Sequence, residues 1–207
     1  MYSRNIERLK KKIKLNRRQR EIIVGKILGD GCLDSINNGR TVRLKIEHSI
    51  KQKEYVEWIY WQLSNLVMTP PKIKTQKRAG KNNIKYWFNT LGIVPLRFYY
   101  QQFYPKGKKL VPKQIHLWLT PLALAVWFMD DGSIKSKECR GKYLNTQGYD
   151  DKSIERLQKS LRQNFGIATT IRQQSDGKQI YIPSSEIVRL REVIGKFVIP
   201  SMKYKLG

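Results

Sequence analysis

The sequence predicts an α+β fold made of two similar halves, each with the order helix, hairpin, helix, hairpin, helix. Two apolar helical runs, "REIIVGKILGDG" and "LALAVWFMDDG", each end at an Asp-Gly pair, and they lie about half the chain length apart. Amphipathic helices and turn-centred hairpins follow both runs in the same order. Self-similarity over so long a period is the mark of an internal duplication. We therefore expect two pseudo-symmetric αββαββα half-domains.

The repeat also sets the expected domain boundaries. We expect a first half-domain over 1–105, a linker over 106–120 and a second half-domain over 121–207. Apolar residues spaced three and four apart predict amphipathic helices over 51–67 and 151–166. The last helix of each half is expected near 94–103 and 185–196, before a proline and a lysine cluster.

Four hairpins are indicated by alternating strands around short turns. Gly-containing turns between alternating apolar and polar residues are the strongest local hairpin signal. The first half carries hairpins at 32–49, around Asn37-Asn38-Gly39, and at 72–90, around Ala79-Gly80. The second half carries them at 133–147, near Arg140-Gly141, and at 169–182, with its turn at Asp176-Gly177.

The charge of the chain indicates a polyanionic partner. Its 207 residues include 41 Lys and Arg against 16 Asp and Glu, a formal net charge of +25. So large a charge destabilises a compact fold by self-repulsion unless a polyanion relieves it. The apolar run at 117–129 is shorter than the roughly 20 residues of a membrane span, so we expect no membrane association.

Other cofactor and targeting signals are weak. Cys32 and Cys139 form no C-x-x-C pair, and His48 and His116 lack metal-ligand spacing, which argues against a zinc site or a disulfide framework. The N-terminal segment is basic but has no apolar signal core, so secretion is not expected. We expect an intracellular protein with ordinary thiols, and an organelle is the expected compartment.

The two Asp-Gly pairs are the candidate chemical centre. One such pair has a simple alternative explanation, in which the glycine ends the helix and the aspartate is solvated. An aspartate at a helix C-terminus is nevertheless unfavourable beside the negative end of the helix dipole. A divalent cation would reverse this, because carboxylates and terminal carbonyls become its oxygen ligands. Asp30 and Asp131 could then serve two phosphodiesters, with nearby lysines offsetting transition-state charge.

The hairpins are the candidate DNA-contacting elements. A two-stranded ribbon fits the major groove of DNA, where Lys, Arg and Gln read base edges or grip phosphates. The alternative explanation is an ordinary solvated strand face. The residues that we assign to DNA contact are Arg40, Arg43, Lys45, Lys72, Lys74, Gln76, Arg78, Lys85, Lys135, Lys137, Arg140, Lys142, Arg172, Gln174 and Lys178.

The motifs resemble those of a known family. "IVGKILGDG" (23–31) and "LAVWFMDDG" (124–132) are similar to the two motifs of single-chain LAGLIDADG homing endonucleases, and "LNTQ" (144–147) and "IPSMKYKL" (199–206) extend the resemblance. It implies a β-saddle formed by two four-stranded sheets. It also implies a monomer that uses Mg²⁺, with Mn²⁺ or Ca²⁺ as substitutes, to cut both strands of a long, asymmetric DNA site. The cuts would leave 3′ overhangs and promote intron homing.

The resemblance also assigns roles to residues by position. Asp30 and Asp131 become the metal ligands, with Gly29 and Asp130 as lesser members of the metal site. Lys109 and Lys205 become the active-site lysines, although Lys108 competes with Lys109 for the first position. Gln147 is expected to order water near the metal.

Three other functions compete with endonuclease activity. An RNA-binding maturase would use the same basic surface to help its own intron RNA fold, and charge does not separate the two because both polymers release counterions. The presence of both acids favours cleavage. A regulator without cleavage activity is disfavoured because no tail remains for a further DNA-binding module. An intein is disfavoured because no splicing blocks flank the repeat.

Overall fold

The protein is described from a computed structural model, which covers Ile6, Arg8, Lys10 and residues 12–36, 40–78, 81–134 and 140–207. The chain forms two compact units. One contains the described residues up to Arg20 together with Asp30–Gln101, and the other contains Glu21–Gly29 together with Gln102–Gly207. These units differ from the half-domains expected from the repeat, because most of the first motif helix packs with the second unit.

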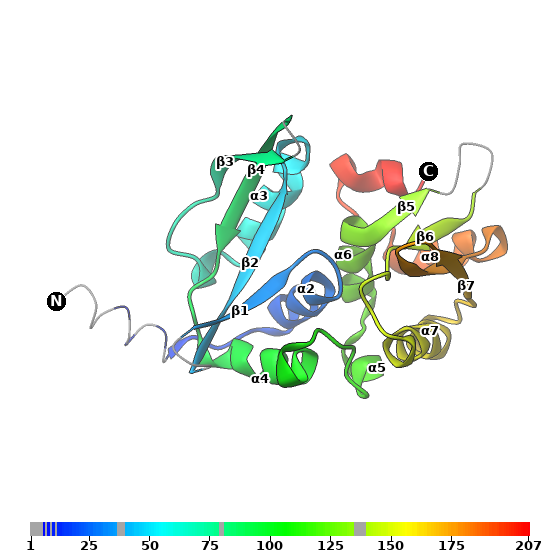
Figure 1. The fold of residues 1–207 in the computed structure, drawn as a ribbon, viewed down its shortest axis with the longest axis horizontal. Helices are drawn as coiled ribbons and strands as arrows, with labels where there is room; N and C mark the ends of the chain where they lie inside the picture. Colours follow the sequence, from blue (N-terminus) through cyan, green and yellow to red (C-terminus); the bar gives the residue numbers. More distant parts are fainter. Residues whose placement is uncertain are drawn as a thin grey trace. The chain divides into compact units, whose positions relative to one another are not determined.

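The first half has the expected order of elements (Figure 1). Gln52 (φ −107°, ψ 27°) and Leu63 (φ −112°, ψ 13°) depart from helical geometry, so the expected helix over 51–67 is divided into α3 and two short 3₁₀ turns. The helices and strands are α2 (Arg17–Leu28), β1 (Cys32–Ile36), β2 (Thr41–Ser49), α3 (Lys53–Gln62), β3 (Lys72–Arg78), β4 (Lys81–Asn89) and α4 (Val94–Phe103), and the 3₁₀ turns are η1 (Ile50–Gln52) and η2 (Ser64–Leu66).

The second half repeats the same order after a short connecting helix. Its helices and strands are α5 (Ile115–Trp118), α6 (Pro121–Asp131), β5 (Gly132–Ile134), β6 (Lys142–Leu144), α7 (Asp151–Phe165), β7 (Thr170–Gln174), β8 (Gly177–Ile182) and α8 (Ile187–Ile194), and its 3₁₀ turns are η3 (Pro105–Gly107), η4 (Ser184–Glu186) and η5 (Pro200–Lys205). The predicted αββαββα duplication is therefore confirmed.

Both halves build an antiparallel four-stranded sheet with the same topology. The strand orders are β1-β2-β4-β3 and β5-β6-β8-β7. Along β2 the even-numbered residues, such as Leu44 and Ile46, are buried, whereas the odd-numbered residues are only partly buried. The apolar face of α3 contacts β2 and β4, so one face of this sheet is covered by a helix (Figure 1).

Local sequence signals explain where several helices begin. Asn16 and Gln19 form a reciprocal capping box before α2, in which each side chain accepts from the other's backbone N–H, at 2.8 and 3.1 Å. Thr120 caps α6, and Pro121 occupies its first turn. Asp150 caps α7 by accepting from the Ser153 N–H at 2.9 Å.

One predicted turn is shifted by a residue. Gln174 pairs with Gly177, so the two-residue turn is Ser175-Asp176 and not Asp176-Gly177. Gly177 instead begins β8 with a positive φ of 135°, which a glycine adopts without strain. The expected turns at 37–39 and 79–80 lie outside the described residues.

The two motif helices, α2 and α6, pack closely over residues 21–29 and 121–131, all of which belong to the second unit. A Cβ atom added at Gly25 would lie 2.5 Å from the Ala123 carbonyl oxygen and 2.7 Å from the Val126 Cβ. Residues 122–130 of α6 are all buried, which is typical of a helix that is apolar on every side. Within the described part of the chain, no helix is both long enough and apolar enough to span a membrane.

We predict that Gly25→Ala destabilises the fold, because the new methyl group meets a backbone carbonyl and a branched side chain. Overpacking of this kind should lower the melting temperature, measured by calorimetry, by roughly 2–12 °C. Gly148→Ala is the matched control, since a Cβ there meets no atom within 4 Å. Equal melting temperatures for the two variants would contradict the close approach at Gly25.

Candidate active site

The glycines after the two motif helices do not act as simple helix terminators. Gly132 has an extended conformation (φ −66°, ψ 134°), and Gly31 is not among the glycines with positive φ. A Cβ at Gly132 would lie 2.4 Å from the Phe128 carbonyl oxygen, so packing requires this glycine. The explanation in which a left-handed glycine merely ends the helix therefore fails at both positions.

A lysine side chain caps the end of each motif helix. Lys109 Nζ donates a hydrogen bond to the Gly29 carbonyl at 3.0 Å. Lys205 Nζ donates to the carbonyls of Met129 and Asp130, at 2.5 and 2.7 Å. These cations lie at the negative ends of the helix dipoles, where a positive charge is stabilising. Lys108 is exposed, so the geometry favours Lys109 as the lysine of the first motif.

The side chain of Tyr149, a residue from the second half, also contacts the last turn of α2. Its hydroxyl donates to the Leu28 carbonyl at 2.9 Å, and Lys109 Nζ lies 5.4 Å from the centre of its ring. Burial, together with the nearby Asp131 and Tyr104, raises the pKa of Tyr149 well above its usual range. The hydroxyl therefore remains a protonated donor at neutral pH. No local sequence pattern marks this residue, and it has no role predicted from the sequence.

The Asp130 side chain forms an ion pair with Lys26. Lys26 Nζ lies 2.7 Å from the carboxylate, and both side chains are completely buried. From the sequence, Asp130 is expected to be a lesser member of the metal site, and Lys26 has no assigned role. The signal for Lys26 was nevertheless present, since it is the one charged residue in the run "IIVGKILG".

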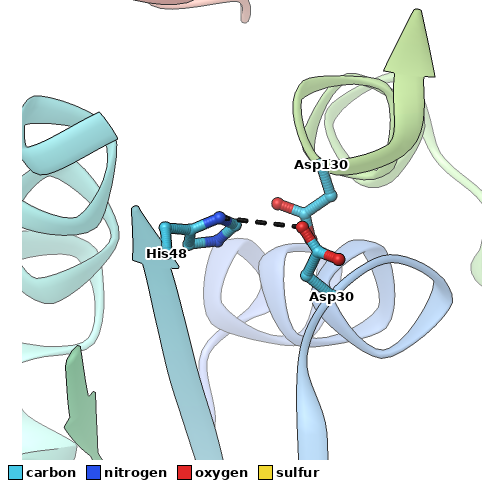
Figure 2. Close-up of side chains that lie close together, drawn as sticks. All are labelled: Asp30, His48 and Asp130. Atoms are coloured by element: carbon cyan, nitrogen blue, oxygen red, sulfur yellow. Dashed lines mark ion pairs between the residues drawn. The ribbon is translucent and has the colours of Figure 1, made fainter. Parts of the chain in front are cut away.

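Asp30 has a histidine neighbour that sequence spacing did not reveal. His48 Nδ1 lies 3.6 Å from Asp30 Oδ2, as Figure 2 shows. The His48 side chain is 3% exposed and the Asp30 side chain 50% exposed. The buried face of β2 carries His48, which packs edge-on against the Tyr55 ring with centroids 5.2 Å apart. His48 therefore restrains one side of a carboxylate that remains open to solvent.

The donor set suits a hard divalent cation. Asp30 is exposed and follows α2, and Asp131 is half-buried and is the last residue of α6, so each carboxylate lies at the negative end of a helix dipole. Carboxylate oxygens are the ligands that Mg²⁺ and Ca²⁺ prefer in proteins. The Gly29 and Asp130 carbonyls already accept from lysines, which leaves the two carboxylates as the principal candidates. Gln147 lies between β6 and α7. Its expected role in ordering water near the metal stays a prediction.

The first sheet presents a basic face on the side opposite α3. Residues that pair directly across strands share a face, and the register joins Lys45 to Asn89, Lys85 to Lys74, and Lys72 to Trp87. The assigned DNA-contacting residues that share this face are Arg43, Lys45, Lys72, Lys74, Gln76 and Lys85. Arg40 is exposed in the turn before β2. We call this surface the basic sheet face.

Two acids lie among these cations. Glu47 Oε2 lies 2.6 Å from Lys74 Nζ and 3.4 Å from Lys45 Nζ. Partial burial on its own would raise the pKa of Glu47, but the hydrogen bonds and charges of the two lysines outweigh it and lower the pKa. Asp34 similarly pairs with Arg43 at 3.1 Å. The acids therefore orient these cations on the sheet.

The second sheet confirms the exposure of some assigned residues and corrects others. Arg172 and Gln174 are exposed, and the Arg172 guanidinium lies 5.3 Å from the centre of the Tyr181 ring. Lys142, however, pairs with Ile182 on the buried face and is 3% exposed. Lys178 points to the same face and forms an ion pair with Asp151 at 2.7 Å. Strand β6 is only three residues long, too short for alternation to reveal its buried face.

Several assignments fall on residues that are not described. Lys135, Lys137 and Cys139 lie outside the described residues, as does the Arg78 side chain. Arg140 is exposed just before β6. Cys32 is an exposed free thiol.

Comparisons with known proteins agree with the duplicated fold and the two motifs. Residues 20–190 match the model of the LAGLIDADG DNA endonuclease family. The chain is 31% identical to DNA endonuclease I-ChuI of Chlamydomonas applanata, over 93% of this chain and 96% of that protein. It is 32% identical to cytochrome b mRNA maturase bI2 of Saccharomyces cerevisiae, of which it spans 48%. The structure of homing endonuclease I-WcaI bound to its DNA recognition sequence superposes with a TM-score of 0.89 at 28% identity, covering 98% of this chain and 92% of I-WcaI.

Proposed function

This chain belongs to the LAGLIDADG DNA endonuclease family and is a site-specific DNA endonuclease, and we propose that Asp30 and Asp131 are the metal ligands with which it cuts both strands of its target. The observation that carries this proposal is the matched pair of helix ends, each with a carboxylate and a lysine. The target would be a long, asymmetric duplex, and the products would have 3′ overhangs. Both motifs lie in one chain, which supports action as a monomer.

The side chains at the helix ends have separate roles in this proposal. Asp30 and Asp131 supply carboxylate oxygens for Mg²⁺, each for one DNA strand. A bound divalent cation lowers the pKa of an attacking water and stabilises the leaving 3′ oxygen. Lys109 and Lys205 are held at the helix ends by carbonyls, which orients their positive charge to offset charge on the pentacovalent phosphate.

The basic sheet face is the proposed surface for target recognition. Its lysines and Gln76 lie on adjacent strands, and a strand ribbon fits the major groove. Arg172 and Gln174 are the corresponding candidates on the second sheet. Lys142 and Lys178 leave this set because they belong to the opposite face. The expected β-saddle requires both sheets to contact the same DNA duplex, and this arrangement stays a prediction.

A second candidate function is binding of intron RNA. Its support is the 32% identity to a protein named as a cytochrome b mRNA maturase. Both phosphodiester polymers release counterions on binding a basic surface, so charge alone does not separate them. Retention of both Asp30 and Asp131 favours DNA cleavage. An organellar compartment, expected from the sequence, stays a prediction.

We predict that Asp30→Asn and Asp131→Asn each reduce Mg²⁺-dependent double-strand cleavage by at least about 100-fold, because each removes a charged metal ligand. The substrate is the DNA target, which is first identified by a cleavage screen of the gene that hosts this reading frame, in its uninterrupted form. Asparagine has nearly the same shape as aspartate, so DNA affinity measured in Ca²⁺ should stay within about threefold. Cleavage at the wild-type rate by either variant would refute the assignment of that acid.

We predict that Lys72→Ala weakens target binding and lowers the slope of log affinity against log salt by about 0.9, the loss of one phosphate contact. Lys178→Ala is the matched control, because it removes the same charge from the second sheet, on the face opposite Arg172 and Gln174. Its affinity and salt slope should remain close to those of the wild type. If both variants lose affinity equally, the basic sheet face is not the recognition surface.

A further inference from the structure

Lys26 and Asp130 form a fully buried ion pair between the two motif helices, within the second unit. Both side chains are 0% exposed, and Lys26 Nζ approaches both carboxylate oxygens at 2.7 Å. Burial of two charges carries a large solvation cost, which their attraction offsets only when the geometry is good. An apolar pair would pack here at no such cost. The retained charges therefore call for an explanation beyond stability.

The Asp130 carboxylate lies over a notch on the surface of α2. Lys26 and Gly29 are three residues apart, so they share one face of this helix. A Cβ at Gly29 would lie 2.4 Å from Asp130 Oδ2 and 2.5 Å from Asp130 Cβ. Only a glycine at this position leaves room for the aspartate, and the lysine one turn earlier supplies the opposite charge. The notch therefore fits the Asp130 side chain in one register of the two helices.

The same contact makes the two motif helices unequal. At corresponding motif positions, α2 has Gly29 where α6 has Asp130, and α2 has Lys26 where α6 has Trp127. A pair of two α2-type helices would bury two lysines without carboxylates, and a pair of two α6-type helices would bury two aspartates without lysines. Each arrangement leaves unpaired charges in an apolar interface, which is strongly unfavourable. Buried polar groups fix register and partner choice in other helix pairs in this way.

We propose that Lys26 is a positioning residue, which locks α6 in register against α2 and engages the Asp130 carboxylate so that it does not serve as a metal ligand. The neighbouring Asp131 then presents the one carboxylate of the second motif to the metal. This catalytic part rests on the proposed function of Asp131, whereas the register lock does not. The Asp130 side chain then does not take the lesser metal role expected from the sequence.

The register lock is tested by a double-mutant cycle of stability. Lys26→Met keeps the length of the side chain and Asp130→Leu keeps its branched shape, and each substitution removes a charge. Each single variant leaves one charge buried without its partner, and its melting temperature should fall by roughly 6–20 °C. The double variant should recover to within about 4 °C of the wild type. If the single variants fail to fold but the double variant folds, the register lock is also supported. If the losses in melting temperature of the two single variants add up in the double variant, the register lock is overturned.

The positioning role is tested on the folded double variant. Its affinity for the target DNA in Ca²⁺ should stay within about threefold of the wild type. Its single-turnover cleavage should slow at least about tenfold, and the Mg²⁺ concentration for half-maximal rate should rise. A purely structural pair would leave the cleavage rate and Mg²⁺ dependence of the folded double variant unchanged, and that result would overturn the positioning role. Failure of the proposed function would show separately, as wild-type cleavage by Asp131→Asn.

Discussion

The close approach of α2 to α6 is the constraint on which the rest of the structure depends. Gly25 and Gly29 carry no side chain at the points where Ala123, Val126 and Asp130 meet the first helix. This contact buries nearly all of both motifs and brings their last turns together within one unit. Asp131 is the last residue of one of these closely packed helices, and Asp30 follows the end of the other. Precise positioning of reacting groups depends on rigid supporting elements of this kind.

Polar side chains provide hydrogen-bond donors at the ends of the two motif helices. Lys109, Lys205 and Tyr149 donate hydrogen bonds to terminal carbonyls that the helices themselves leave without partners. Lys109 follows the last helix of the first half and Lys205 follows the last helix of the second, so each of these lysines combines helix capping with its proposed catalytic charge. Lys26 and Asp130 add a charged contact whose corresponding residues in the other motif, Trp127 and Gly29, carry no charge. The duplicated fold is thus symmetric in its backbone but not in its buried charges.

The sequence predicted the fold well because periodicity and turn residues are local signals. The order of elements and the bounds of α4 followed from them, as did the shared face of Lys72, Lys74 and Gln76. Contacts between distant segments were not predictable in this way. His48 was dismissed for lack of ligand spacing, although the strand that carries it brings it to Asp30. Lys142 was assigned to the wrong face because three residues of strand give too little alternation.

The central claim is that Asp30 and Asp131 hold the metal while Asp130 is engaged by Lys26. A crystal structure of the protein with its target DNA and Mn²⁺ tests it most directly, because Mn²⁺ is located by anomalous scattering. We expect anomalous peaks within coordination distance of the Asp30 and Asp131 carboxylates, with the Asp130 carboxylate still bound to Lys26. Peaks away from both acids, or a peak ligated by the Asp130 carboxylate, would contradict the account.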